Sequence, residues 1–179
     1  MDSQEAARRW AATWIVAWQT HDVESVVALY ADDCVHRSTP FRPPHHGRQG
    51  VRDYVTQAFA DEQRIDEVRF GTPVVQGDRA CVEYWARFLD AHGTAMTLAG
   101  CAMARFDADG RIAEARDYWH LEHGHRPPPQ EWGREVVRNP RPTAARARQV
   151  LYVDDRAAEL PGIQGPNLLL GDNCPSSGL

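Results

Sequence analysis

Apolar residues recur with helical spacing in three stretches of the N-terminal third of the chain. Residues three and four apart share one face of a helix, so these stretches predict amphipathic helices at about residues 3–20, directly after Asp22, and at about 48–60. Asp22 suits the N-cap of the second. The expected apolar positions are Ala7, Trp10, Ala11, Trp14 and Trp18 in the first helix, Val23, Val26, Val27 and Tyr30 in the second, and Val51, Tyr54, Val55, Ala58 and Phe59 in the third.

The period changes to alternation after residue 65, which is typical of strands. Strands are predicted at about 66–75, 79–89, 95–106 and 111–120, separated by the turn signals QGD, DAHG and DADG. Their short connections make consecutive strands antiparallel neighbours. A further short strand is predicted at 34–38, before the proline-rich loop TPFRPPHHG. The expected fold is α+β: a cone-shaped curved antiparallel sheet packed on three N-terminal helices and enclosing a cavity.

Composition changes near residue 125 and suggests two parts. Residues 1–125 carry the predicted helices and strands. Residues 126–179 form a Pro- and Arg-rich extension with a possible helix at 143–160. The Gly, Pro, Ser and Asn content of 161–179 favours a disordered end.

Charge and residue usage exclude several classes of function. The 179 residues carry a net charge of −5, so neither nucleic acid nor a membrane surface is an expected partner. The N-terminal residues MDSQEAARRW have no apolar stretch typical of a signal peptide, so the expected compartment is the cytoplasm. All 20 basic residues are arginine, which excludes a lysine Schiff base and a Walker lysine. The four cysteines, at 34, 81, 101 and 174, have no CxxC spacing, which disfavours a zinc site or a redox dithiol.

A lone carboxylate in the last predicted strand is the main candidate for chemistry. Alternation in EARDYWH places Asp117 on the same face as Ala115 and Trp119, which we expect to look inward. Desolvation would raise the pKa of such an aspartate toward neutrality, as a general acid or base requires. The alternative is an aspartate paired with a buried arginine or a helix N-terminus, and the sequence leaves both open.

Histidines and tryptophans add further candidates. His36 lies on the predicted short strand and could act as a base or hydrogen-bond donor, whereas His45 and His46 are expected to be exposed in the loop. The group His120, His123 and His125 lacks the fixed geometry of a dedicated metal site, so no metal is expected. The tryptophan stripe of the first helix is explained first by core packing and second by a ligand-binding wall.

The order of these segments resembles the SnoaL-like group of the nuclear-transport-factor-2-like superfamily. The resemblance is carried by HDVESVVALYADDCVHRSTPFRPPHHGRQGV, VVQGDRACVEYWARF and ARFDADGRIAEARDYWH, over about residues 8–123. It implies that Asp117 takes the position of the catalytic aspartate of the cyclases. It also implies that His36 and Ser38 take the positions of water-positioning residues in the epoxide hydrolases. Their second Asp and their Arg fall on Ala86 and Tyr84, so that relay is broken.

The expected function is therefore a cofactor-free small-molecule enzyme, a cyclase, lyase or hydrolase acting on an apolar or polyketide-like substrate. The alternative is a non-catalytic binding or dimerisation module of the same fold. We expect a homodimer that pairs through the outer sheet face, where Trp85 should point outward. The expected catalytic residues are Asp117 and His36, and the expected substrate-binding residues are Trp14, Trp18, Ser38, Phe41, Tyr54, Tyr84, Ala102 and Trp119.

Overall fold

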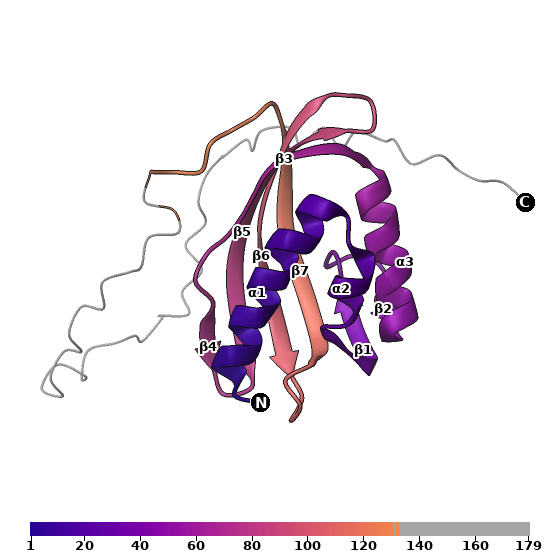
Figure 1. The fold of residues 1–179 in the computed structure, drawn as a ribbon, viewed down its shortest axis with the longest axis vertical. Coiled ribbons are helices and arrows are strands. Elements are labelled where there is room, and N and C mark those ends of the chain that lie inside the picture. The colour runs from indigo at the N-terminus through magenta and orange to yellow at the C-terminus, as the bar shows by residue number, and fades with distance from the viewer. Residues whose placement is uncertain (131, 133–179) are drawn as a thin grey trace, which may run out of the picture. The chain divides into compact units, whose positions relative to one another are not determined.

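A computed structural model describes residues 1–130 and 132. Its helices are α1 (Ser3–Thr20), α2 (Val23–Val27) and α3 (Gly47–Ala60). Its strands are β1 (Tyr30–Arg37), β2 (His45–His46), β3 (Glu62–Phe70), β4 (Val74–Gln76), β5 (Arg79–Asp90), β6 (Ala95–Phe106) and β7 (Ile112–His123). The predicted α+β class is confirmed, with the helices grouped at the N-terminal end of the sequence and on one side of the sheet (Figure 1).

The sheet is mixed, although the sequence predicted an antiparallel one. Its strand order is β2-β1-β7-β6-β5-β3, with β4 paired to β5. The strands β3, β5, β6 and β7 pair antiparallel as predicted. The strand β1 lies parallel to β7, and no local sequence pattern predicts this pairing. The pairing places His36 opposite Ala115. This register brings His36 close to the residue two further along β7, Asp117.

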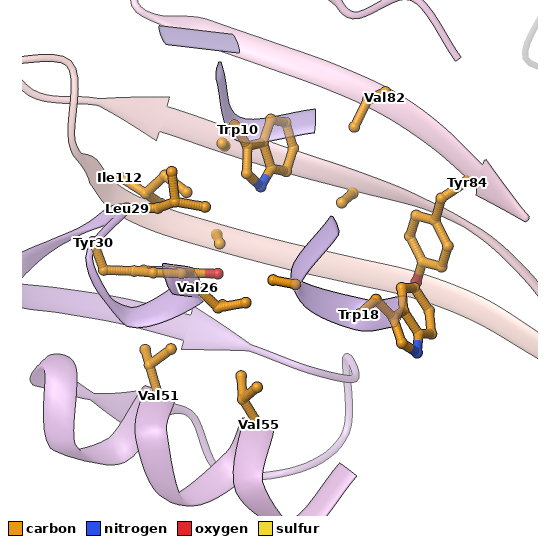
Figure 2. Packing of buried hydrophobic residues seen from close by; sticks show 14 of the residues in the cluster. Trp10, Trp18, Val26, Leu29, Tyr30, Val51, Val55, Val82, Tyr84 and Ile112 are labelled. Atoms are coloured by element: carbon orange, nitrogen blue, oxygen red, sulfur yellow. The ribbon is translucent and has the colours of Figure 1, made fainter. Parts of the chain in front are cut away.

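The first helix matches its prediction. Asp2 caps it by accepting a hydrogen bond from the backbone N–H of Gln4 at 3.4 Å, and His21 ends it in the left-handed conformation at φ 53°. The helix lies across the sheet (Figure 1), and Figure 2 shows its Trp10 and Trp18 in the core. The buried residues of the helix are Ala6, Ala7, Trp10, Ala11, Ala17 and Trp18.

Two predicted element boundaries were wrong. The second helix ends at Val27, and Tyr30 begins β1 instead of completing the helix face. The ladder between β1 and β7 is irregular between Tyr30 and Val35, so the adjacent Asp32 and Asp33 are both exposed and the alternation that marks a strand is lost.

The strand predicted at 66–75 is divided in two. Pro73 lacks the N–H that a continuing ladder needs, and the chain leaves the sheet between β3 and β4. The N–H of Gly71 still donates to the carbonyl of Glu83 at 2.8 Å. This hydrogen bond keeps the segment between β3 and β4 next to β5.

The two faces of β5 follow the predicted alternation. Val82, Tyr84, Ala86 and Phe88 are buried against the helices, and Cys81, Glu83, Trp85 and Arg87 lie on the outer face. Figure 2 shows Val82 and Tyr84 pointing toward the same interior as Trp10 and Trp18. This interior is the hydrophobic core, and it contains the candidate site.

The outer face is partly covered by the segment that follows β7. The indole N–H of Trp85 donates to the carbonyl of Arg126 at 2.9 Å, and its ring meets Trp132 edge to face at 6.3 Å between centroids. The predicted helix at 143–160 and the predicted disordered end at 161–179 lie outside the described residues. Within the described residues, no helix is both long and apolar enough to cross a membrane.

Candidate functional site

A pocket of about 470 Å³, part of it open to solvent, lies between α1 and the inner face of the sheet. Its wall is dominated by aromatic and small apolar side chains, with two groups that can exchange protons on the side of β1 and β7. The lining residues are Trp10, Trp14, Trp18, Tyr30, His36, Phe70, Tyr84, Leu98, Ala102, Ala115 and Asp117.

The two proton-exchanging groups are the side chains of His36 and Asp117. Nε2 of His36 lies 3.5 Å from Oδ2 of Asp117, and the two side chains are 2% and 15% exposed. On the other side of the imidazole, Nδ1 lies 3.1 Å from the hydroxyl of Tyr30. If the Tyr30 hydroxyl donates to Nδ1, the ring proton is on Nε2 and points toward the carboxyl group.

Burial controls the charge of this pair. It lowers the pKa of His36 to about 3, with a further contribution from His45, so the imidazole is neutral at neutral pH. Burial raises the pKa of Asp117 to about 7. At neutral pH the carboxyl group is therefore present in both its protonated and its ionised form, as a group that accepts and then returns a proton requires.

Asp117 has no arginine partner among the described residues. Of the arginines on nearby strands, Arg87 pairs with Glu67 at 2.7 Å and Arg105 lies 3.7 Å from Glu114. An arginine pair would have lowered the pKa of Asp117. This excludes, within the described residues, the alternative that Asp117 is a structural residue paired with a buried arginine.

Tyr84 adds the hydroxyl of a further lining residue to the polar groups of the pocket. The Tyr84 ring packs edge to face on Trp18 (Figure 2), at 5.9 Å between ring centroids. It also stacks on Phe70 at 5.5 Å. Its hydroxyl would lie 2.7 Å from a Cβ added at Gly100, so the absence of a side chain there makes its position possible. Burial, and then the charge of Asp117, raise the pKa of Tyr84, so its hydroxyl remains a donor.

The structure brings most of the predicted site residues together. Trp14, Trp18, Tyr84 and Ala102 line the pocket with the predicted catalytic pair. Trp119 points its indole N–H to the carbonyl of Ser38 at 2.9 Å and is 37% exposed, outside the lining.

Ser38 and Tyr54 form a layer behind His36 instead of contacting the pocket. The hydroxyl of Ser38 lies 3.2 Å from Nε2 of His45. The Tyr54 ring stacks on His45 and lies 4.9 Å from the His36 ring. His45 is thus half-buried, contrary to the expected exposure, and helps to hold the His36 ring in place.

Phe41, which was predicted to bind substrate, does not reach the pocket in this structure. Its side chain is 98% exposed in the proline-rich loop, and it is not among the residues that line the pocket. A loop that contains three prolines turns away from the sheet too early for Phe41 to reach the interior.

Sequence reasoning missed Tyr30, which lines the pocket, and Glu62, which contacts the lining residue Trp18. Tyr30 was assigned to a helix, because the irregular start of β1 hides the alternation that would have placed it beside His36. Glu62 was not noticed, because it sits among charged residues in sequence. Its carboxylate accepts hydrogen bonds from the indole N–H of Trp18 at 3.0 and 2.9 Å, and Nε2 of His21 lies 3.7 Å away. Burial raises the pKa of Glu62 to about 7.

The described residues contain no group of three or more His, Cys, Asp or Glu side chains arranged to hold a metal ion. Besides the indole N–H groups of three tryptophans, the described lining residues carry one carboxyl group, one imidazole and two phenols. These groups can transfer protons and donate hydrogen bonds to a substrate oxygen, and the surrounding aromatic wall suits an apolar ligand.

The chain belongs to the SnoaL-like domain family, whose model matches residues 8–115. The match includes His36 and ends two residues before Asp117. A search of curated proteins finds no match.

Two solved structures illustrate the shared fold. One is an NTF2-like protein of unknown function from Exiguobacterium sp. 255-15, with a TM-score of 0.54 and 19% identity over 64% of this chain and 98% of that one. The other is SalBIII, described as an epoxide hydrolase/cyclase-like enzyme in pyran ring formation in the polyether salinomycin. It has a TM-score of 0.59 and 16% identity over 68% of this chain and 98% of that one. At these identities the likeness concerns the fold.

Proposed function

We propose that this protein is a cofactor-free enzyme that moves a proton on an apolar, polyketide-like substrate, with Asp117 as the general acid and base. The reaction class is a ring closure, an elimination or a hydrolysis. The observation that carries the proposal is the Asp117 carboxyl group, raised in pKa to about 7, beside the Nε2 atom of a neutral, buried His36 at the wall of an aromatic pocket.

Each polar group has a role in this reaction. The ionised form of Asp117 removes a proton from an acidic C–H or O–H of the substrate, and the resulting acid returns it at another atom. The Nε2–H of His36 faces the carboxylate and stabilises its charge, while Tyr30 fixes the tautomer. The Tyr84 hydroxyl donates a hydrogen bond to the substrate oxygen on which negative charge develops.

Two further facts support this assignment. The wall is free of lysine and arginine, so a carboxylate substrate has no cation to bind, whereas an apolar one gains from burial against three tryptophans. SalBIII, which shares the fold, is itself described as cyclase-like.

A second candidate is a protein that binds an apolar ligand without reacting with it. The aromatic wall favours it as well, since seven of the eleven lining residues are apolar or tryptophan. The two candidates differ in whether Asp117 exchanges a proton with the bound ligand.

The test uses an aromatic 1,3-dicarbonyl compound, whose central C–H is acidic, in deuterated buffer. If the proposal is right, the protein accelerates deuterium incorporation at that carbon, and Asp117→Asn lowers the rate by about 10²- to 10⁴-fold. Quenching of tryptophan fluorescence should show that this variant still binds the compound. Asp33→Asn, an exposed aspartate on β1, is the matched control and should keep the rate. Binding with no acceleration by the unaltered protein would favour the second candidate.

We also propose that the protein forms a homodimer through the outer face of the sheet. Met103 and Tyr118 are 43% and 47% exposed there, which is unusual for large apolar side chains on a sheet. Trp85 contributes less exposed apolar surface to this interface than the sequence suggested, because Arg126 and Trp132 contact it. Light scattering at micromolar concentration should give twice the chain mass, and Met103→Glu should give the single mass.

A further inference from the structure

The outer face of the sheet brings two cysteines together that lie far apart in sequence. Cys81 on β5 is opposite Met103, and Cys101 on β6 is opposite Glu83, so the two cysteines are diagonal neighbours across the β5–β6 ladder. Their Sγ atoms are 3.0 Å apart. Both are free thiols, and neither belongs to the pocket on the other face.

The distance between the sulfurs is short for atoms that are not bonded. A disulfide has a length of about 2.05 Å, so the two sulfurs need to approach by roughly 1 Å, through side-chain rotation together with a small movement of the two strands. Both residues are half-buried on the outer face of the single chain, so a small oxidant in solution can reach them whenever a partner does not cover this face. The third free cysteine described, Cys34, is fully buried in the core.

We propose that Cys81 and Cys101 are a modification site at which a reversible intramolecular disulfide forms when the protein meets a peroxide. One thiolate attacks a peroxide oxygen, which gives a sulfenic acid and a hydroxide ion that takes up a proton. The second thiolate then attacks the sulfenic sulfur and displaces a second hydroxide ion, which takes up the other proton released by the thiols. Two thiols and one hydrogen peroxide thus give one disulfide and two waters, with two electrons passed from sulfur to oxygen.

The environment of Cys101 controls the rate of disulfide formation. Burial raises the pKa of the Cys101 thiol, so little thiolate is present at neutral pH. Disulfide formation should accordingly be slow at neutral pH and faster as the pH rises. The attack of the second cysteine on the sulfenic acid is favoured despite the small amount of thiolate, because the partner sulfur is close and belongs to the same molecule.

The register explains why the bond would be reversible. Diagonal neighbours in an antiparallel sheet have Cα atoms about 7–8 Å apart, whereas disulfides prefer about 5.5–6 Å. Closing the bond therefore draws β5 and β6 out of their preferred spacing. Disulfides closed under such strain are the more easily reduced ones.

The experiment uses the full-length chain with Cys174→Ser, so that the cysteine outside the described residues does not compete. The chain lacks lysine, and cleavage after Arg79, Arg87 and Arg105 places the two cysteines on separate peptides, 80–87 and 88–105. After treatment with hydrogen peroxide and alkylation, we expect these peptides to be joined within one chain, with a mass lower by two hydrogens. Millimolar reduced glutathione should restore both thiols.

Matched variants test the assignment. Cys81→Ser and Cys101→Ser should each abolish the joined peptides, whereas Cys34→Ser should leave them. Peptides that carry separately oxidised cysteines, or a bond between two chains, would overturn the proposal. A joined product that resists glutathione would overturn its reversibility.

Discussion

The Nε2 atom of His36 lies 3.5 Å from Oδ2 of Asp117, across the parallel pairing of β1 with β7. This contact joins a histidine that burial keeps neutral to an aspartate that burial makes easier to protonate. Because the imidazole stays neutral, the carboxyl group is the member of the pair that gains and loses a proton near neutral pH.

The rate of proton removal should rise with pH through about 7. Asp117 acts as a base only when it is ionised, and its pKa is raised to about 7. The rate of deuterium incorporation measured from pH 5 to pH 9 should therefore increase and then level off. His36 should add no second step in this range, because its pKa is lowered to about 3. A rate that falls as pH rises would contradict the role of Asp117 as the base.

Removing the hydroxyl of Tyr30 should slow the reaction more than it weakens binding. Tyr30→Phe keeps the ring but loses the contact with Nδ1 of His36 at 3.1 Å, so the tautomer with the proton on Nε2 is no longer favoured. A lost hydrogen bond of about 1.5 kcal/mol corresponds to about tenfold in rate. Tyr118→Phe, on the outer face, is the control. An equal loss in ligand affinity and rate would indicate a structural effect only.

A side chain at position 100 should destabilise the sheet. The added Cβ of Gly100→Ala would lie 2.7 Å from both the Tyr84 hydroxyl and the Tyr118 carbonyl, so backbone as well as side chain must move. We expect a loss of about 2 kcal/mol in the free energy of unfolding, measured in urea. Gly71→Ala is the matched control, because the nearest atom to its Cβ is 3.7 Å away. Equal stability of the two variants would contradict the close approach.

Glu62 should make the protein less stable as pH rises. Its pKa is raised from 4.5 to about 7 in the folded state, so the unfolded chain loses its proton first and the folded state is favoured at lower pH. Between pH 4.5 and 7 the free energy of unfolding should fall by up to about 3 kcal/mol from this group. The raised pKa of Asp117 also lowers the free energy of unfolding as pH rises. The contribution of Glu62 is therefore measured as the difference in pH dependence between the unaltered protein and Glu62→Gln. The exposed Glu83→Gln should follow the unaltered protein.

Much of the fold and half of the site could be predicted, because alternation is a local property. The positions of Asp117 and Tyr84 on the inner face follow from counting along β7 and β5. The stripe of tryptophans on α1 likewise placed Trp14 and Trp18 in the pocket wall.

The rest depended on pairings between distant segments. The contact of Tyr30 with His36 needs the irregularity in β1, and the contact of His36 with Asp117 needs the parallel register. The spacing of Cys81 and Cys101 resembled no redox motif, because the strand register, not the sequence interval, brings their sulfurs together.

The pairing of β1 with β7 also decides when the site can exist during synthesis. The strand β1 leaves the ribosome early, yet its sheet neighbour is the last described strand, so its edge stays without that partner until most of the chain has emerged. Contacts that close such a long stretch of chain form slowly, and an unpaired edge is prone to association with other chains. Proton-transfer activity would thus serve as a reporter of completed folding, and fragments that end before β7 should be both inactive and prone to aggregation.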